Sequence, residues 1–116
     1  MCGRFVMFRS LDEYVQELDP QHDLFKAADK TPVERYNIAP STDVPIIHTH
    51  PDGPQISSVH WGWKREVTWP KPKVVQPINA RIETIAKGRF YKDLFPDHRA
   101  LIPSDGWYEW VQDVPG

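Results

Sequence analysis

The sequence lacks several features that mark common protein classes. It contains one cysteine in 116 residues, which excludes an internal disulfide and a zinc site built mainly from thiolates. No apolar run approaches the ~18 residues of a membrane-spanning helix, and the N-terminus lacks the apolar stretch of a signal peptide. Its 14 basic and 16 acidic residues nearly balance, which argues against a general polyanion binder but allows a local basic groove. These absences favour a single-domain protein of the reducing cytoplasm.

Helices are predicted to be few and short. The 12 prolines are about twice the usual proportion of ~5%, and proline interrupts helices. One helix is predicted from Ser10, which forms a capping box with Glu13, to a stop at Pro20. Shorter helices are predicted over residues 23–30 and 84–95, the second weakened by an internal glycine.

Extended segments account for most of the remaining pattern. A strand is predicted within residues 1–9, and residues 44–63 predict a hairpin around a His-Pro-Asp-Gly-Pro loop. Residues 64–77 are basic and broken by prolines, which indicates a surface loop. Asp105 and Gly106 between two apolar runs predict a second hairpin. The predicted class is therefore α+β, with more strand than helix.

Cys2 offers a distinctive chemistry because of its position. Once Met1 is removed, its α-amine and thiol form a 1,2-aminothiol, and an α-amine is partly unprotonated near neutral pH. The amine can condense with an aldehyde to a Schiff base, and the thiol can then close a five-membered thiazolidine. On position alone the alternative is a small apolar residue beside the initiator methionine.

Two other residues are candidates to assist this chemistry. Asn79 can orient a nucleophile through its amide, with Arg81 on the same side of an extended segment. Glu109 lies between aromatic residues, where burial favours a protonated carboxyl group suited to acid–base catalysis. The alternatives are an asparagine turn before a helix and a solvent-facing glutamate.

Basic and aromatic side chains offer a means of binding nucleic acid. Arginines and the lysines of residues 64–73 can neutralise phosphates, and tryptophans can stack on bases. The candidates are Arg4, Arg35, Arg81, Arg89 and Arg99, with Trp61, Trp63 and Trp69. The alternative is a solvated surface with tryptophans as core anchors. Three histidines, His48, His50 and His60, lack a thiol or clear acidic partner, so no metal site is predicted.

Five segments together resemble the SRAP family, whose name abbreviates SOS response-associated peptidase. They are Met-Cys-Gly-Arg-Phe at 1–5, Arg-Tyr-Asn-Ile-Ala-Pro at 35–40, Trp-Gly at 61–62, Ile-Asn-Ala-Arg-Ile-Glu-Thr at 78–84, and Arg-Ala-Leu-Ile-Pro-Ser-Asp-Gly-Trp-Tyr-Glu-Trp at 99–110. A chance match would have to reproduce all five in this order. The resemblance implies a distorted, mainly antiparallel β-barrel with short flanking helices.

The resemblance also implies an activity and its residues. The chain would remove Met1, and Cys2 would then form a thiazolidine crosslink with an abasic site in single-stranded DNA during the SOS response to DNA damage. Asn79 would orient Cys2 and the sugar, and Glu109 would act as acid and base in both steps. The implied DNA-binding residues are Arg4, Asn37, Pro40, Trp69, Arg81 and Arg89. No metal or organic cofactor is implied.

The sequence departs from the family pattern in two places. The family's further catalytic histidine lies downstream of the Asp-Gly-Trp-Tyr-Glu-Trp motif, and His98 is in the wrong context to replace it. The apolar strand at 106–111 also requires a neighbour on each side, so residues 1–116 are expected to be the N-terminal part of an SRAP domain. After Trp61-Gly62 the sequence diverges, and Trp69 is the candidate for the family's aromatic wedge.

Two other functions remain open on the sequence. One is a non-catalytic fragment of the family that binds single-stranded DNA or a partner. The other is a cysteine peptidase acting in trans through Cys2 and Glu109, although no Cys/His pairing for thiol proteolysis is recognisable.

Overall fold

Short strands dominate the architecture. The computed structural model describes residues 2–21, 23–25, 28–68 and 70–112. The elements are, in chain order, β1 (Phe5–Met7), α1 (Leu11–Leu18), β2 (Arg35–Ile38), β3 (Asp43–His48), β4 (Gln55–His60), β5 (Arg65–Val67), β6 (Lys73–Val75), β7 (Ala100–Leu101) and β8 (Gly106–Trp107). None of the helices in this part of the chain is long and apolar enough to span a membrane.

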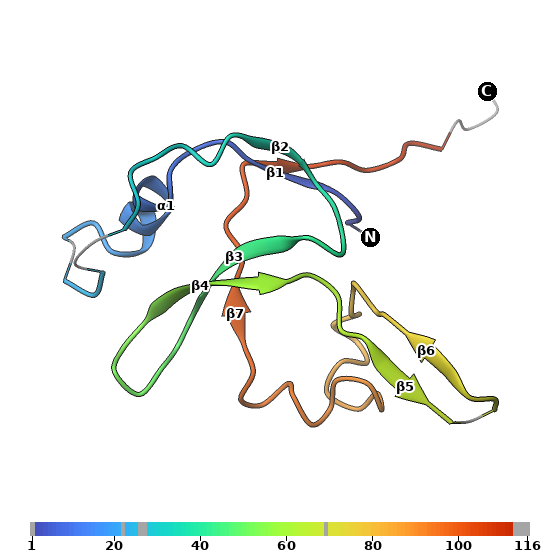
Figure 1. Cartoon of the computed structure of the whole chain (residues 1–116). Helices are drawn as coiled ribbons and strands as arrows, with labels where there is room; N and C mark the ends of the chain where they lie inside the picture. Colours follow the sequence, from blue (N-terminus) through green and yellow to red (C-terminus); the bar gives the residue numbers. More distant parts are fainter. Residues whose placement is uncertain (1, 22, 26–27, 69, 113–116) are drawn as a thin grey trace.

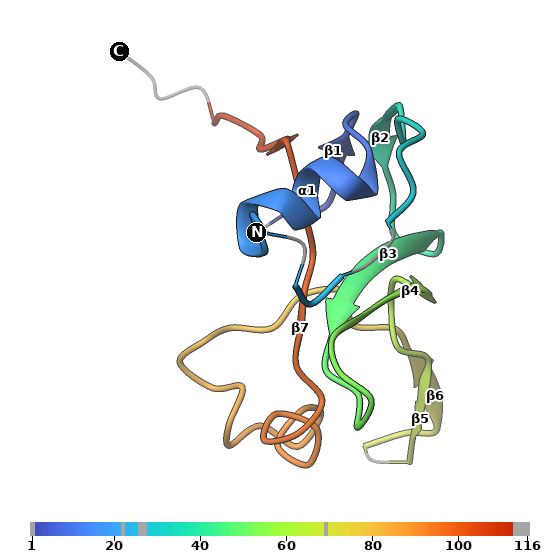
Figure 2. The same ribbon diagram turned by 90° about the vertical axis from the view of Figure 1, so that its left-hand side faces the viewer.

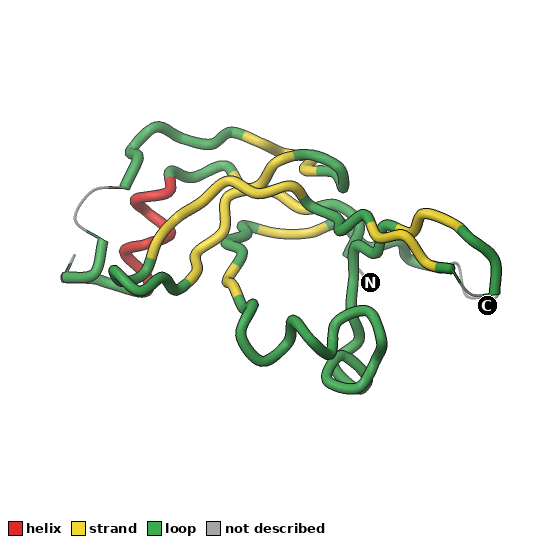
Figure 3. The backbone as a smooth tube through the Cα atoms, turned by 60° about the horizontal axis from the view of Figure 1, so that its bottom comes forward, coloured by secondary structure: helices red, strands yellow, loops and turns green. Residues whose placement is uncertain are grey.

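The strands pair in three separate antiparallel sheets, with the orders β2-β1-β8, β4-β3-β7 and β5-β6. Helix α1 lies at one end of the molecule and the β5–β6 hairpin at the other (Figure 1, Figure 3). The predicted α+β class and antiparallel pairing are confirmed. The described residues contain one helix rather than several, and their sheets form no closed barrel, so the barrel stays a prediction.

The core is organised around the central strand β1. Its alternation buries Phe5 and Met7 on one face, as the sequence predicts, and leaves Val6 half-buried on the other. Phe5 lies opposite Ile38 of β2 on one side and Trp107 of β8 on the other. Burial of an apolar side chain such as Phe5 or Ile38 contributes roughly 1.5–3 kcal/mol. Their packing therefore stabilises the pairing of β2 with β1.

Helix α1 begins as the sequence predicts. The Ser10 hydroxyl oxygen accepts a hydrogen bond from the backbone N–H of Glu13 at 3.2 Å, which satisfies one of the free donors at the helix start. The helix buries Tyr14 and Val15, and Val15 forms a small second core with Phe25 and Ile47.

The helix predicted over residues 23–30 is wrong for the described part of that segment, which contains no helix. The buried carboxylate of Asp19 instead accepts hydrogen bonds from the backbone N–H groups of residues 23, 24 and 25, at 2.8–3.1 Å. A side chain that captures these donors holds the backbone in a turn and competes with helix formation.

The two hairpins of the central region have different outcomes. The hairpin predicted over residues 44–63 is confirmed as β3–β4, with a register from Asp43 opposite His60 to His48 opposite Gln55. The surface loop predicted over 64–77 is wrong, because β5 and β6 form a second hairpin there. Its prolines lie outside the strands, at positions where they remove no ladder donor.

The helix predicted over residues 84–95 is also wrong, because that segment forms successive single turns. The carbonyls of Arg81, Thr84, Gly88 and Tyr91 each accept from the N–H groups three and four residues later. A short helix needs an apolar face packed against the fold, whereas no residue from 84 to 95 is fully buried. Without that packing the turns do not join into a helix.

The hairpin predicted around Asp105 and Gly106 is wrong as well. Strand β7 pairs with β3 and strand β8 pairs with β1, so the two strands flanking these residues belong to different sheets. Figure 2 shows this segment passing from the level of β7 up to β1. Asp105 therefore does not occupy a hairpin turn but lies between two sheets.

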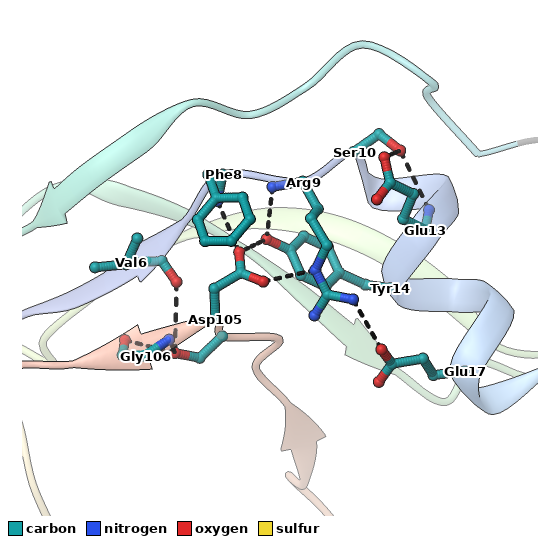
Figure 4. A network of polar contacts seen from close by, with 10 residues as sticks. Val6, Phe8, Arg9, Ser10, Glu13, Tyr14, Glu17, Asp105 and Gly106 are labelled. Atoms are coloured by element: carbon teal, nitrogen blue, oxygen red, sulfur yellow. Dashed lines mark hydrogen bonds and ion pairs between the residues drawn. The ribbon is translucent and has the colours of Figure 1, made fainter.

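The Asp105 carboxylate is the centre of a buried polar network (Figure 4). One oxygen accepts from the Phe8 N–H at 2.8 Å and from the Tyr14 hydroxyl, and the other accepts from Arg9 Nε at 2.6 Å. Burial by itself raises the pKa of the Asp105 carboxyl, but these hydrogen bonds and the Arg9 charge outweigh burial and lower it. Burial and the bond to Asp105 raise the pKa of Tyr14 to about 12, so its hydroxyl keeps its proton.

Gly62 is required by a close approach. Its φ of 113° lies in the region that favours glycine. A Cβ at this position would lie 2.5 Å from Nε2 of Gln76, which donates to the Ser41 hydroxyl oxygen at 2.9 Å. Gly53 has a similar φ of 114° but no atom within 4 Å of such a Cβ.

Asp105→Asn is expected to destabilise the fold. The amide side chain would keep the shape of the carboxylate but lose the charge that holds Arg9, at a cost of about 2–3 kcal/mol. Urea unfolding measures this, with the exposed Asp93→Asn as the control. The pKa of Asp105 in the folded protein is below the unfolded value of ~3.9. The stabilisation that the Asp105 carboxylate provides is therefore complete above pH ~3.9 and is lost as the pH falls through the folded pKa. If the difference in unfolding free energy between wild type and Asp105→Asn does not decrease below pH ~4, this assignment is contradicted.

The two glycines give a matched pair of substitutions. Gly53→Ala is expected to cost about 1–2 kcal/mol through backbone strain alone. Gly62→Ala is expected to cost more, because Gln76 must also move and give up its bond to Ser41, worth about 1 kcal/mol. Thermal unfolding measures both, and equal losses in the two variants would refute the close-approach argument.

Candidate functional site

Cys2 lies just before β1 and is half-buried against the core formed by Phe5 and its neighbours. Its thiol donates to the backbone carbonyl of Arg4 at 3.3 Å. Its own carbonyl accepts from the Asn79 side-chain amide at 2.9 Å, across 77 residues of sequence. The structure therefore brings together the two residues that the sequence singled out as nucleophile and orienting amide.

The segment that carries Asn79 is held by two aromatic side chains. The Trp61 indole N–H donates to the carbonyl of Ile78 at 3.1 Å, and the Tyr91 hydroxyl donates to the carbonyl of Asn79 at 3.4 Å. Burial raises the pKa of Tyr91, so the hydroxyl remains a donor at neutral pH. These bonds fix the backbone of Asn79 and leave its amide directed at Cys2.

Cys2 and Asn79 line an apolar cavity of about 430 Å³. Its other walls come from β1, β3, β4 and the ends of β7 and β8. They are Phe5, Val44, Ile46, Val59, His60, Trp61, Gly62, Ile78, Ile102, Ser104 and Trp107. A reacting group in this cavity would be shielded from water on its apolar sides.

A second, larger cavity of about 810 Å³ opens on the other side of the N-terminal segment. It is lined by Gly3, Arg4, Tyr36, Asn37, Tyr108, Glu109 and Trp110. We call it the polar groove after the side chains of Arg4, Asn37 and Glu109, although apolar atoms form most of its surface. It exists because β1 lies between β2 and β8, so that strand ends carrying these residues lie side by side.

Hydrogen bonds between neighbouring strands order the polar groove. Arg4 Nη1 donates to the side-chain oxygen of Asn37 at 3.1 Å. The Tyr108 N–H donates to the carbonyl of Arg4 at 3.0 Å, and its hydroxyl donates to the carbonyl of Tyr36 at 2.7 Å. Glu109 lines this groove as an exposed residue, so the solvent-facing alternative describes its position. Residues 2 to 4 separate the groove from the apolar cavity.

Three further predicted DNA-binding residues, Pro40, Arg81 and Arg89, do not line either cavity. Pro40 is half-buried in the turn between β2 and β3. Arg81 and Arg89 are exposed, and the Arg89 guanidinium lies 5.4 Å from the ring centre of Phe90. Trp69 falls outside the described residues. The structure thus groups Arg4 and Asn37 with Glu109 and does not bring Pro40, Arg81 or Arg89 to them.

The aromatic walls of the polar groove are not among the predicted site residues. Tyr36 and Tyr108 belong to the motifs at 35–40 and 99–110, but the residues predicted from these motifs are Asn37, Pro40 and Glu109. Their contact runs from a hydroxyl to a backbone carbonyl, which residue type alone does not reveal. Among the described residues no group of three or more histidine, cysteine, aspartate or glutamate side chains is placed to hold a metal.

The Asn79 amide is expected to control access to the thiol. Asn79→Ala removes the anchor of the Cys2 carbonyl, so the N-terminal segment should open more often and thiol alkylation should accelerate several-fold. The alkylation rate reports on Cys2 alone, because Cys2 is the one cysteine in the sequence. The matched control is Asn37→Ala, which removes a bond to Arg4 but none to Cys2. Equal alkylation rates for wild type and Asn79→Ala would contradict the anchoring role.

Comparison with known proteins agrees with the resemblance stated above. The family described as SOS response associated peptidase (SRAP) matches residues 1–115. The chain is 34% identical over 113 residues to the abasic site processing protein YedK of Escherichia coli K12, covering 97% of this chain and 49% of YedK. It is 30% identical over 112 residues to the abasic site processing protein YoaM of Bacillus subtilis 168, covering 95% of this chain and 47% of YoaM.

A third relative gives the same result. The abasic site processing protein YoqW of Bacillus subtilis 168 is 29% identical over 117 residues, covering 99% of this chain and 50% of YoqW. The chain therefore spans about half the length of the curated relatives it matches. The family match over nearly all of its residues places this chain in the SRAP family.

Proposed function

We propose that the chain binds single-stranded DNA at abasic sites and links to them covalently through Cys2. The observation that carries this proposal is the bond from the Asn79 amide to the Cys2 carbonyl at 2.9 Å, which holds an aminothiol precursor between a polar groove and an apolar cavity. The three relatives are each named as abasic site processing proteins, which supports the same substrate for this chain.

The chemistry requires two covalent stages. Water first cleaves the peptide bond between Met1 and Cys2, releasing methionine and a free α-amine on Cys2. The amine then attacks the aldehyde carbon of the ring-opened deoxyribose, and loss of one water gives an imine. The thiol adds across the C=N bond, with sulfur joining the carbon and the proton passing to nitrogen, which closes the thiazolidine.

Three features of the site would serve these stages. The Asn79 amide holds the Cys2 carbonyl, which belongs to the residue that must become the nucleophile. Glu109 lines the groove beside residues 3 and 4 and would transfer protons to and from the leaving water. The apolar cavity around the thiol would limit hydrolysis of the imine before ring closure.

The polar groove fits a single strand better than a duplex. Arg4 offers positive charge for a phosphate, and Tyr36, Tyr108 and Trp110 offer faces for unpaired bases. Trp110 is fully exposed, so it could stack on a base without displacing another part of the described chain.

A protein that forms this adduct needs a reduced thiol, which is the reason we assign it to the cytoplasm.

The groove by itself also suits a second candidate function, non-covalent binding of single strands. Its basic and aromatic residues do not depend on the chemistry of Cys2. The two functions differ in one observable, because only a covalent adduct with the DNA survives denaturation of the protein.

Cys2→Ala is expected to abolish a denaturant-resistant adduct with a single-stranded oligonucleotide carrying one abasic site. Wild type should give a shifted band on a denaturing gel. Cys2→Ser keeps the amine and is expected to give a band only after borohydride reduction of the imine, because it lacks the thiol that closes the ring. Intact mass is read first to establish that Met1 has been removed.

Two results would refute the covalent proposal. One is a processed wild-type protein that gives no stable adduct, and the other is a Cys2→Ala band as strong as that of wild type. Salt-sensitive binding of the oligonucleotide without an adduct would instead identify the non-covalent function.

A further inference from the structure

The apolar cavity beside Cys2 has polar side chains in its walls, but these side chains already have partners. The indole N–H of Trp61 and the hydroxyl of Ser104 each donate to a backbone carbonyl, at 3.1 Å and 2.8 Å. The Asn79 amide donates to the carbonyl of Cys2. A molecule with several hydroxyl groups would therefore find few partners in this cavity, whereas an alkyl chain needs none.

One side of the cavity is open to solvent. Ile102 and Trp107 line it and are 54% and 67% exposed. His60 is also exposed, and its Nδ1 atom lies 3.7 Å from the carboxylate of Asp43. The aliphatic side chains that β3 and β4 contribute are buried or half-buried, and they are Val44, Ile46 and Val59. A small apolar molecule can therefore enter from the exposed side and pack against walls that are already formed.

The volume of the cavity suits a small ligand. At about 430 Å³ it falls within the range of ~300–1,000 Å³ that is typical of small-molecule sites. Each methylene group that is fully removed from water strengthens binding about fourfold. An alkyl chain of about six carbons can thus bind here through burial alone.

The cavity wall also includes a group that reacts with one class of small molecule. Cys2 lines the cavity, and removal of Met1 gives the same residue a free α-amine. The amine attacks an aldehyde carbon, and loss of one water gives an imine. The sulfur then joins that carbon while the thiol proton passes to nitrogen. This sequence needs no oxidant, reductant or further reactant.

From this arrangement we infer that the apolar cavity binds free aliphatic aldehydes and that Cys2 captures them as thiazolidines. The inference rests on the proposed function for the aminothiol at Cys2 and adds a second substrate class. The alkyl chain occupies the apolar cavity, whereas DNA would lie in the polar groove on the other side of residues 2 to 4. Because the sequence has one cysteine, a chain that has captured an aldehyde cannot capture an abasic site.

The test compares the rates at which the protein captures propanal and hexanal in the absence of DNA. Methionine aminopeptidase first exposes Cys2, whether or not the chain removes Met1 itself. Intact mass identifies the adduct as protein plus aldehyde minus one water. Hexanal should react at least tenfold faster than propanal, because each of its three additional methylenes contributes up to about fourfold. The peptide Cys-Gly-Arg-Phe has the sequence of residues 2–5 without the cavity, and its two rates should agree within twofold.

Two valine variants test whether the preference arises in the cavity. Val59→Thr keeps the shape of the side chain but adds a hydroxyl to the cavity wall, so the ratio of the hexanal rate to the propanal rate should fall several-fold. Val74→Thr makes the same change at an exposed position of β6 and should keep the wild-type ratio. In the unmodified chain, hexan-1-ol should slow alkylation of the Cys2 thiol to a plateau, whereas propan-1-ol at the same concentration should not.

A wild-type rate ratio equal to that of the peptide would overturn the inference, and so would alkylation that hexan-1-ol does not slow. Equal ratios in folded Val59→Thr and Val74→Thr would overturn it too. These measurements contain no DNA, so failure of the proposed function has a different signature. A protein that prefers hexanal but forms no adduct with an abasic single strand would refute the proposed function and leave this inference supported.

Discussion

The fold depends on the pairing of the Asp105 carboxylate with donors from helix α1 and from the residues that join it to β1. Phe8, Arg9 and Tyr14 all donate to it, across more than ninety residues. Removing a carboxylate from water is costly unless its charge and lone pairs are satisfied. Three donors arranged around one carboxylate therefore fix how the later segment aligns with β1, although β7 and β8 contribute only two paired residues each.

The candidate site follows from that alignment. Asp105 immediately precedes β8, so its anchoring determines where Tyr108 and Glu109 lie relative to β1. The polar groove then arises between the ends of β2, β1 and β8. Asn79 reaches Cys2 from the other side of the N-terminal segment. Cys2 is thus held between two independently anchored parts of the chain, which is the property that the proposed covalent capture requires.

The local features of this fold could be predicted from the sequence. The N-cap at Ser10 and the turn within residues 44–63 act over a few residues, and both predictions are confirmed. The helix at 84–95 and the hairpin at Asp105 failed because long-range factors decide them. One is the lack of packing along 84–95, and the other is the set of donors that removes Asp105 from a turn.

The same distinction applies to the candidate site. The chemistry of Cys2 and Asn79 is evident from residue type and motif, and the structure supplies their contact. The groove formed by Tyr36 and Tyr108 could not be predicted, because its order depends on backbone carbonyls of a neighbouring strand. Likewise, the β5–β6 hairpin could not be predicted, because the prolines of residues 64–77 obscured the pattern of its two short strands.

The most direct test of the central claim is the intact mass and peptide map of the protein after incubation with an abasic single strand. The account predicts an adduct equal to the protein without Met1 plus the oligonucleotide minus one water. Tandem fragmentation should place that adduct on Cys2. An adduct on a lysine of the β5–β6 hairpin, or none on a chain that has lost Met1, would contradict it.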